Sequence, residues 1–391
     1  MKVKAIETFL VTLPFRFAFG HSLATRADST NVIVRVTLDD GTQGYGEGVP
    51  RDYVTGENAE AARQSIEQLY APRLIGTDVS DQTALRVVLE AVFAELQLDK
   101  HARGSSWCAM ELAIIDAACK AKQTRVIDAF GPVLNQRIRY GGVIPFGGKK
   151  AVLGMLWFYK LYGFKTVKLK VGKTLEDDER LVAMARKIMG PDAIIRVDAN
   201  CAWNADHTLR AAEIFRKYGV ASYEQPVPHD DLAGLKRITS SLQEQVLVDE
   251  SLCTVEQAEH LAAEKICSAF NVRISKVGGF NAARKIVDIA ERHGLSVHLG
   301  AQVGESGILS AAARAFAMVN KSFDNYEGSM NAFLLKSDLT NENLTVGFGG
   351  YGDANFARGQ RYGFGTSIAE GSLESWSTQR PAIGSEVQAS A

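Results

Sequence analysis

The sequence lacks the cysteine patterns that bind zinc or build a disulfide framework. Its five cysteines are odd in number and share no CxxC spacing, so we expect free thiols in a reducing compartment. No stretch approaches the roughly 20 apolar residues of a membrane helix. The amino-terminal run MKVKAIETFLVTLPF is too interrupted for a signal peptide. These absences predict a cytoplasmic protein with no membrane segment.

Concentrated charge of one sign is also absent. The 44 lysines and arginines nearly balance the 45 aspartates and glutamates, and no long basic run occurs. Nucleic acids and anionic membrane surfaces are bound by a concentrated positive field. The balance therefore excludes both as expected partners and favours a small-molecule ligand.

The chain is long enough, at 391 residues, for a large domain with an accessory domain. In the first part, VKAIETFLVTL predicts a strand and NVIVRVTLDDGTQGYGEG a hairpin that turns at Asp-Asp-Gly. Helical spacing of alanine and leucine follows over residues 58–70 and 105–123. We expect an α+β domain over residues 1–130.

From about Tyr140, β-rich runs alternate with amphipathic helical segments, which is typical of βαβ units. Eight such runs predict an α/β domain over residues 131–330, a compact (β/α) barrel. A doubly wound open sheet is the alternative, but no strand-anchored GxGxxG occurs. Residues 331–391 are glycine-rich and then polar. We expect them to return to the first domain, with a partly disordered tail from about Ser372. The runs are GGVIPFG, TVKLKVG, IIRVDAN, ASYEQP, VLVDES, FNVRIS, SVHLGA and DNYEGS.

Acidic residues stand at the ends of three consecutive predicted strands, one β/α unit apart. They are Asp198, Glu224 and Asp249. Converging carboxylates repel one another unless a cation lies between them. Ligation by oxygen alone favours Mg²⁺, or Mn²⁺, over zinc. The alternative is that each acid caps a helix or pairs with a lysine.

Two lysines lie on one face of the second predicted barrel strand, TVKLKVG. Lys168 and Lys170 are two residues apart, and the apolar alternates would meet the helices. The lysines are therefore predicted to point into the barrel beside the metal. A partly desolvated lysine near another cation has a lowered pKa and can act as a base. We assign that role to Lys170, with Lys168 lowering its pKa and contacting a carboxylate.

The motifs KLKVG, DAN, EQP, DES and KVGG occur in this order, and together the chain resembles the enolase superfamily in its muconate-lactonising (mandelate racemase/muconate cycloisomerase-like) subgroup. The resemblance implies a modified (β/α)7β barrel with a capping domain. It also implies one Mg²⁺ on the three acids, Lys170 as acid/base, a small carboxylate substrate and a homo-oligomer. Capping-domain loops at residues 15–31 and 50–56 would form a lid. His21, Arg26, Arg51 and Tyr53 in them could meet the substrate or be plain surface residues.

One position departs from the family pattern. The resemblance implies a second catalytic lysine three residues before Lys276 of KVGG, and this sequence has Arg273 there. Arginine stays protonated, so it is a poor base and a good fixed cation. The sequence thus predicts a reaction with one proton carrier, an isomerase or lyase of the muconate-cycloisomerase type. The alternatives are a racemase or epimerase of N-acylamino acids or dipeptides, or a catalytically impaired metal-binding homologue.

Further polar residues complete the candidate site. The acidic pair by which dipeptide-epimerising relatives bind an ammonium group would fall on Gly328 and Met330, with Glu327 adjacent. Dipeptides are therefore disfavoured. His298 is expected to be structural more than catalytic, and Glu305 to bind substrate or cap a helix. Asn200, Gln225 and Glu250 closely follow the acids and are expected to orient them.

Overall fold

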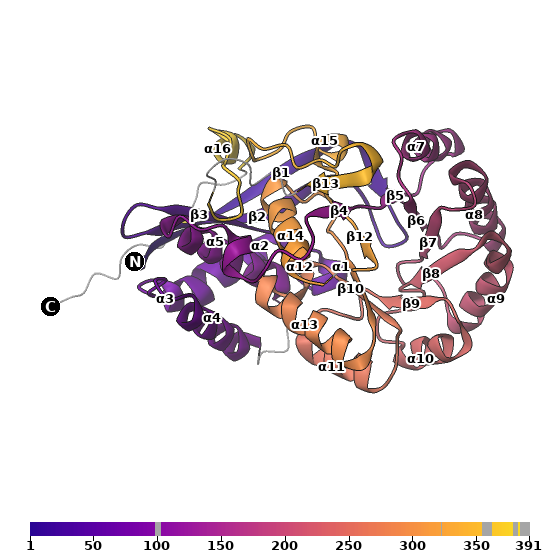
Figure 1. Cartoon of the computed structure of the whole chain (residues 1–391), viewed down its shortest axis with the longest axis horizontal. Coiled ribbons are helices and arrows are strands. Elements are labelled where there is room, and N and C mark those ends of the chain that lie inside the picture. The colour runs from indigo at the N-terminus through magenta and orange to yellow at the C-terminus, as the bar shows by residue number, and fades with distance from the viewer. Residues whose placement is uncertain (98–102, 322, 354–361, 378–381, 384–391) are drawn as a thin grey trace.

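The computed structural model describes residues 1–97, 103–321, 323–353, 362–377 and 382–383. An antiparallel sheet covered by helices lies against a barrel of parallel strands ringed by helices (Figure 1). No helix in the described part of the chain is both long and apolar enough to cross a membrane.

The first unit is a four-stranded antiparallel sheet in the order β14-β1-β2-β3. The predicted hairpin is confirmed: β2 and β3 pair in register, and Gly41 takes φ +84° in the Asp-Asp-Gly turn. Its strands are β1 (Val3–Gly20), β2 (Thr25–Leu38), β3 (Gln43–Gly48) and β14 (Ala382–Ile383). Its helices are α1 (Asp52–Thr55), α2 (Ala59–Ser65), the π-helical turn η1 (Ile66–Tyr70), α3 (Ala71–Leu74), α4 (Gln82–Gln97), α5 (Gly104–Ala121) and α6 (Val126–Ala129).

Three glycines explain how closely β3 approaches α5. Gly44, Gly46 and Gly48 alternate along the strand, so all three face one side of the sheet. A Cβ atom on any of them would fall within the backbone of Ala113, Ala109 or Ser105 in α5. The GYGEG motif is therefore a contact surface for a helix, and larger residues would force α5 away from the sheet.

The second unit is the predicted barrel. Eight parallel strands run in the order β12-β11-β10-β9-β8-β7-β6-β5, and a bridge between Tyr140 and Tyr326 brings the two ends together. The (β/α)7β pattern is thereby confirmed. The strands are β5 (Gly142–Ile144), β6 (Thr166–Lys170), β7 (Ile194–Asp198), β8 (Val220–Glu224), β9 (Gln245–Val248), β10 (Ala269–Val272), β11 (Ser296–Leu299) and β12 (Asn325–Tyr326). The helices between them are α7 (Lys149–Leu161), α8 (Leu175–Met189), α9 (Ala205–Phe215) with the short turn η2 (Arg216–Tyr218), α10 (Leu232–Ser241), α11 (Val255–Ala263), α12 (Ile274–Val277), α13 (Gly279–His293) and α14 (Gly307–Val319).

The barrel strands alternate between an apolar outer face and a polar inner face. On β6, Val167 and Leu169 belong to the hydrophobic core beneath the helices. Lys168 and Lys170 instead bond to carboxylates of neighbouring strands. This alternation places both lysines inside the barrel, as their spacing predicts. The interior of this barrel is thus a charged site rather than an apolar plug.

The expected lid segment at residues 15–31 is not a loop. β1 continues to Gly20 and β2 begins at Thr25, so only a short turn separates two long paired strands. Burial alternates from Val11 to Phe15, and the pairing with β2 is irregular between Pro14 and Phe19. In the second expected loop, residues 50–56, the helix α1 forms and ends at Gly56 with φ +71°.

The carboxyl-terminal segment packs back onto the first sheet. β14 pairs with β1, and α16 (Ser372–Trp376) lies beside β1 (Figure 1). Where a disordered tail was expected from Ser372, this helix forms because Leu373 is buried against the β1 core. The rest of the predicted tail, residues 378–381 and 384–391, lies outside the described residues. The remaining elements are β4 (Arg137–Arg139), α15 (Asn331–Leu334), η3 (Phe348–Gly350) and β13 (Tyr351–Asp353).

Buried glutamates of the first unit bind the amino termini of barrel helices. Glu47 of β3 accepts hydrogen bonds from the backbone N–H groups of Ser306 (2.9 Å) and Leu309 (2.9 Å) at the start of α14. Glu111 of α5 accepts from the N–H of Phe280 in α13. Helix amino termini favour negative charge and leave N–H groups unpaired. These two acids therefore fix the sheet unit on the barrel.

Glu47→Ala is expected to lower the free energy of unfolding by about 2–4 kcal/mol, because two buried N–H groups lose their acceptor. Urea denaturation followed by circular dichroism measures the change. Glu60→Ala is the matched control, since the Glu60 side chain is 42% exposed and bonds only to Arg63 and Gln64 of its own helix α2. Equal stability of the two variants would show that Glu47 does not hold α14.

Candidate active site

The three predicted metal-binding acids lie side by side at one edge of the barrel sheet. Asp198 and Glu224 are the last residues of β7 and β8 and are paired in register, and Asp249 directly follows β9. None of the three is exposed to solvent. Water therefore does not screen their charges, and the site needs compensating cations.

The chain itself supplies several of these cations. Lys168 donates to both Glu224 oxygens, at 3.0 and 3.1 Å, and to Glu327 at 2.7 Å. Arg196 donates to the same two glutamates, at 2.9 and 2.8 Å. Glu224 and Glu327 are thus each held by the same two buried cations. Glu327 directly follows β12, the last strand of the barrel. The buried cationic side chains around the acids are Lys168, Lys170, Arg196, Arg273 and Lys276.

Lys170 lies at the carboxyl end of β6, beside the first acid. Its Nζ donates to Asp198 Oδ2 at 2.6 Å and to Asn200 Oδ1 at 2.7 Å. Asn200 in turn donates to Glu250 Oε1 at 2.9 Å. The Lys170 side chain is buried and lines the main cavity. This geometry presents an amine to a ligand while two acceptors fix its position.

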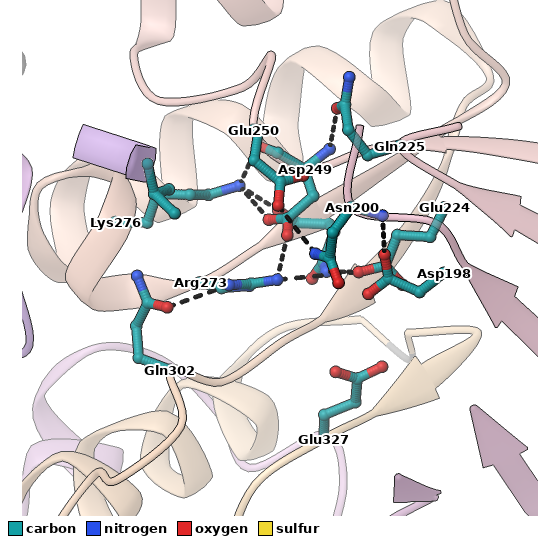
Figure 2. Close-up of polar contacts among 12 residues, drawn as sticks. Asp198, Asn200, Glu224, Gln225, Asp249, Glu250, Arg273, Lys276, Gln302 and Glu327 are labelled. Carbon is teal, nitrogen blue, oxygen red and sulfur yellow. Dashed lines mark hydrogen bonds and ion pairs between the residues drawn. The ribbon is translucent and has the colours of Figure 1, made fainter. Parts of the chain in front are cut away.

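The guanidinium of Arg273 points toward the acids (Figure 2). Its guanidinium bonds to Asp249 Oδ2, lies 3.8 Å from Glu224 Oε1 and donates to Gln302 at 3.0 Å. Lys276 is wholly buried. Its Nζ atom donates to Asp249 Oδ1 at 2.7 Å and to the backbone carbonyl of Asp249 at 2.6 Å. Arg273 therefore lies between two of the three acids.

The buried acids have different pKa values because their cationic partners differ. Burial alone raises the pKa of a carboxyl group. At Glu224, Lys168 and Arg196 outweigh burial and hold the pKa well below its ordinary value, and Arg273 and Lys276 lower that of Asp249. Burial and the nearby Glu224 raise the pKa of Asp198. Burial, Asp249 and Asp198 raise the pKa of Glu250 to about 7. Negative charge is thus incompletely compensated on the Asp198–Glu250 side.

The chemistry of the acids fits a hard divalent cation. Asp198, Glu224 and Asp249 offer oxygen donors of high charge, and the buried Oε2 atom of Glu250 has no hydrogen-bond partner. In the described residues, however, no three acidic, histidine or cysteine side chains are grouped so that they could hold one metal ion. Arg273 is one of the cations that occupy these acids, since its guanidinium bonds to Asp249 and lies 3.8 Å from Glu224. A divalent cation and Arg273 would therefore compete for Asp249 and Glu224.

Loops with left-handed backbone conformations follow two of the acids. Asn200 has φ +42° and Gln225 has φ +34°. The Gln225 side chain accepts from the backbone N–H of Asp249 at 2.9 Å and donates to Ser251 Oγ at 2.8 Å. Gln225 thereby ties the loop after β8 to the loop after β9. Such strained positions persist where surrounding contacts fix them.

A cavity of about 640 Å³ opens above the acids, and Lys170, Arg273 and Glu250 lie at its floor. His21 and Tyr53 line it from the first unit, and their side chains are 3.2 Å apart at Nε2 and Oη. Burial, with Lys170 and Arg273 nearby, lowers the pKa of His21 to about 3. Arg26 stacks over the Tyr53 ring, with its guanidinium carbon 5.6 Å from the ring centre.

Arg51 is not a surface residue, although that alternative was open from the sequence. It is only 2% exposed and donates to Ser29 Oγ and to the backbone carbonyl of Val303, both at 2.7 Å. Val303 belongs to the loop after β11. Arg51 therefore connects the first unit to the barrel at the rim of the cavity.

His298 and Glu305 differ in their access to the cavity. His298 is buried, bonds to Gln245 at 3.0 Å and is absent from the cavity lining. Glu305 lines the cavity and accepts from the N–H of Gln302. The helix cap at α14 is instead Ser306, whose hydroxyl accepts from the N–H of Ile308. The position of Glu305 thus favours contact with a ligand.

Burial raises the pKa of Glu305 to about 8, which predicts a pH effect on ligand binding. Below pH 8 the side chain is neutral, and above it a negative charge faces the cavity. Binding of a carboxylate such as phenylacetate is expected to weaken about threefold to tenfold between pH 7 and pH 9. Isothermal titration calorimetry measures this. Glu305→Gln should remove the change, and an unchanged pH profile in that variant would assign the effect to another group.

Sequence reasoning missed three polar residues of the site. Arg196 stands two residues before Asp198 on β7, and Asn271 stands two residues before Arg273, where it donates to Glu224 at 2.7 Å. The two-residue period of a strand would have placed both on the inner face. Gln302, which binds Arg273, lies in an irregular loop and carries no such signal.

Comparisons with known proteins give matches over both units of the chain. A sequence model of the mandelate racemase / muconate lactonizing enzyme N-terminal domain matches residues 5–131, and one described as enolase C-terminal domain-like matches residues 157–371. The chain is 27% identical over 351 residues to L-Ala-D/L-Glu epimerase of Bacillus subtilis (strain 168), covering 88% of this chain and 92% of the relative. It is 29% identical to chloromuconate cycloisomerase CbnB of Cupriavidus necator over 353 residues, with the same coverage of 88% and 92%.

A solved structure shows the same architecture over nearly the whole chain. Muconate lactonizing enzyme from Pseudomonas fluorescens, complexed with muconolactone, matches with a TM-score of 0.87 at 26% identity, covering 96% of this chain and 99% of that chain. The fold, the two matching domains and the curated relatives agree. The chain belongs to the enolase superfamily, in the subgroup of the muconate lactonizing enzymes.

Proposed function

We propose that this enzyme removes the proton α to the carboxylate of a small molecule, with Lys170 as the base, in an isomerase or lyase reaction of the muconate-cycloisomerase type. The observation that carries the proposal is the position of Lys170. Its amine lies in the cavity and is held by Asn200 and by Asp198, the first of the three strand-end acids. General bases work when they are fixed within reach of the proton they remove.

Asp198, Glu224 and Asp249 would hold Mg²⁺, and Mn²⁺ suits the same oxygen donors. A bound divalent cation supplies fixed positive charge close to the substrate carboxylate, where negative charge develops as the proton leaves. Lys168 and Arg196 keep Glu224 ionised. Lys276 does the same for Asp249. The chain's own cations thus maintain the acids in the charged form that a metal needs.

Proton transfer is proposed to occur on one side of the substrate. β6 and β10 are four strands apart in an eight-stranded barrel, so Lys170 and Arg273 line the cavity from opposite sides. Lysine can exchange a proton, whereas the arginine guanidinium stays protonated. Lys170 therefore delivers and removes the proton, and Arg273 stabilises negative charge from the opposite side.

Racemisation or epimerisation is the second candidate, because relatives include an L-Ala-D/L-Glu epimerase and an N-succinyl-L-Arg/Lys racemase. Such a reaction needs proton carriers on both sides of the reacting carbon. In this chain the side opposite Lys170 carries Arg273. The arrangement therefore supports the one-sided reaction more strongly.

Deuterium uptake in D₂O tests the proposal. Pools of lactones, N-acylamino acids, dipeptides and hydroxy acids are incubated with the full chain and Mg²⁺, and mass spectrometry detects exchange. We expect uptake by one class of carboxylate, with loss of uptake after chelation of the metal. If no pool exchanges while Mg²⁺ binding is measurable by calorimetry, the site is a metal-binding one without this activity.

A further inference from the structure

The cavity above the acids has a charged floor and an uncharged wall. The wall is formed by two strand residues from β1, two residues from α7 and two from the segment after β12. We call it the apolar wall, and it comprises Phe17, Phe19, Met155, Phe158, Met330 and Phe333. The charged residues of the cavity lie elsewhere, on the strand ends and in the segments that hold His21 and Arg51. Such a cavity is suited to a ligand with one ionic end and one apolar end.

The apolar wall retains exposed hydrophobic surface. Phe17 is 43% exposed and Phe158 is 36% exposed, although both rings belong to the cavity lining. Phe158 also contacts the Phe333 ring, with ring centres 5.2 Å apart, so the two sides of the wall are continuous. Water in contact with such rings is unfavourable, and an apolar ligand group that displaces it is stabilised in proportion to the apolar area that it buries.

Most acid oxygens of the cavity have partners, and the exception is the buried Oε2 atom of Glu250 at the cavity floor. Glu327 is bonded to Lys168 and Arg196, Glu250 to Asn200, and Glu305 to the N–H of Gln302. None of them belongs to the apolar wall. A second charged group held against this wall, whether ammonium or carboxylate, would be desolvated without a partner, which weakens binding. The wall therefore selects against charge at the far end of the ligand.

We infer that the substrate is a monocarboxylate whose remaining part is a bulky, uncharged aryl or alkyl group that packs against the apolar wall. The inference rests on the proposed function for the placement of the carboxylate near Lys170. It adds the chemical class of the substrate, which the reaction type alone leaves open. The cavity of about 640 Å³ lies within the 300–1,000 Å³ typical of sites that enclose drug-sized ligands.

Equilibrium binding of unreactive acids tests this class. Phenylacetate, 3-phenylpropanoate, 4-phenylbutanoate and 5-phenylpentanoate are titrated into the full chain with Mg²⁺ by calorimetry. The Kd is expected to fall about fourfold for each added methylene, the factor that corresponds to burial of one CH₂ group. The compound 3-(4-aminomethylphenyl)propanoate, which is 3-phenylpropanoate with an ammonium group at the end far from the carboxylate, is expected to bind at least tenfold more weakly than that acid. A Kd that is constant along the series, or tighter binding of this aminomethyl compound, would overturn the inference.

Gly154 allows the wall to be altered without a clash. It lines the cavity from α7, and a Cβ atom there meets no other atom within 4 Å. Gly154→Leu is expected to fill the space beside Phe158 and to remove the gain in affinity along the series. Leu153→Ala is the matched control, because Leu153 is exposed on the same helix and is absent from the cavity lining. It should retain the full series. Loss of the gain in both variants would contradict a role for the wall.

The binding test examines the ligand class and the deuterium test examines the reaction, so either claim can be wrong while the other stands. If the acids bind as expected but no carboxylate exchanges its α-proton, the proposed reaction is wrong and the ligand class stands. If small or doubly charged carboxylates exchange while the phenylalkanoate series shows no gain, the reaction stands and the ligand class is wrong.

Discussion

Lys170→Met is expected to lower the rate of α-deuterium exchange about 10³-fold or more, since a positioned base contributes about 10²–10⁴-fold to proton transfer. Methionine keeps the length and apolar stem of lysine and removes the amine. Asp198 would keep Lys168 as a cationic neighbour, at 3.5 Å in the native protein, so the fold should be retained. The exchange rate is measured by mass spectrometry and the fold by thermal unfolding.

Lys165→Met is the matched control for this prediction. Lys165 directly precedes β6 and is exposed, so it lies at the opposite end of the strand from the acids. Its replacement should leave exchange within about twofold, because surface substitutions rarely disturb a distant site. If Lys170→Met retains most of the native rate, another group is the base, and the assignment of Lys170 is wrong.

Arg273→Met is expected to tighten Mg²⁺ binding about tenfold or more. Arg273 bonds to Asp249 and lies 3.8 Å from Glu224, so a cation entering between these acids meets a guanidinium already there. Two cations that share the same carboxylates disfavour each other by several kcal/mol at short range. The structure therefore predicts that native Arg273 weakens metal affinity, while Lys276 keeps Asp249 ionised in the variant.

Calorimetric titration with Mg²⁺, and electron paramagnetic resonance with Mn²⁺, measure this affinity without turnover. Gln302→Leu serves as a comparison, because it removes a neutral partner of Arg273 and leaves its charge. Only the loss of the guanidinium should produce the large gain. Equal Kd values for the native chain and Arg273→Met would show that Arg273 and the metal do not share these acids.

The barrel could be predicted from the sequence because its signals are local. Each strand is a short β-rich run, and the acids at the ends of β7, β8 and β9 are in register because one β/α unit separates them. The pairing of Lys168 and Lys170 on one face follows from the two-residue period of a strand. The same period would have identified Arg196, since the run IIRVD alternates toward Asp198.

Other features depend on contacts that a sequence does not encode locally. The strands that flank the turn at residues 21–24 form through long pairing between β1 and β2. Helix α4 is the exception, since Leu85 and Leu89 at helical spacing are a local signal that would have predicted it. The burial of Arg51 depends on the distant Val303 carbonyl. The capping of α14 by Glu47 likewise joins residues 259 positions apart.

The position of Arg273 was apparent from the sequence, but its contacts were not. The KVGG motif places Arg273 directly after β10, the sixth strand of the barrel. The chemistry of arginine excludes a role as base. Its placement between Asp249 and Glu224, with Gln302 as a further partner, depends on side-chain geometry inside the barrel. From this contact we expect substitution of Arg273 to change both metal affinity and reaction type.

The measurement that tests the central claim most directly follows exchange and configuration on one sample. A single enantiomer of the exchanging substrate is incubated with the native enzyme in D₂O. Proton NMR records loss of the α-proton, and chiral chromatography records the opposite enantiomer. With Lys170 as the sole proton carrier, deuterium should enter with retained configuration, and Arg273→Lys should add inversion. Inversion by the native enzyme at the rate of exchange would contradict one-sided proton transfer by Lys170.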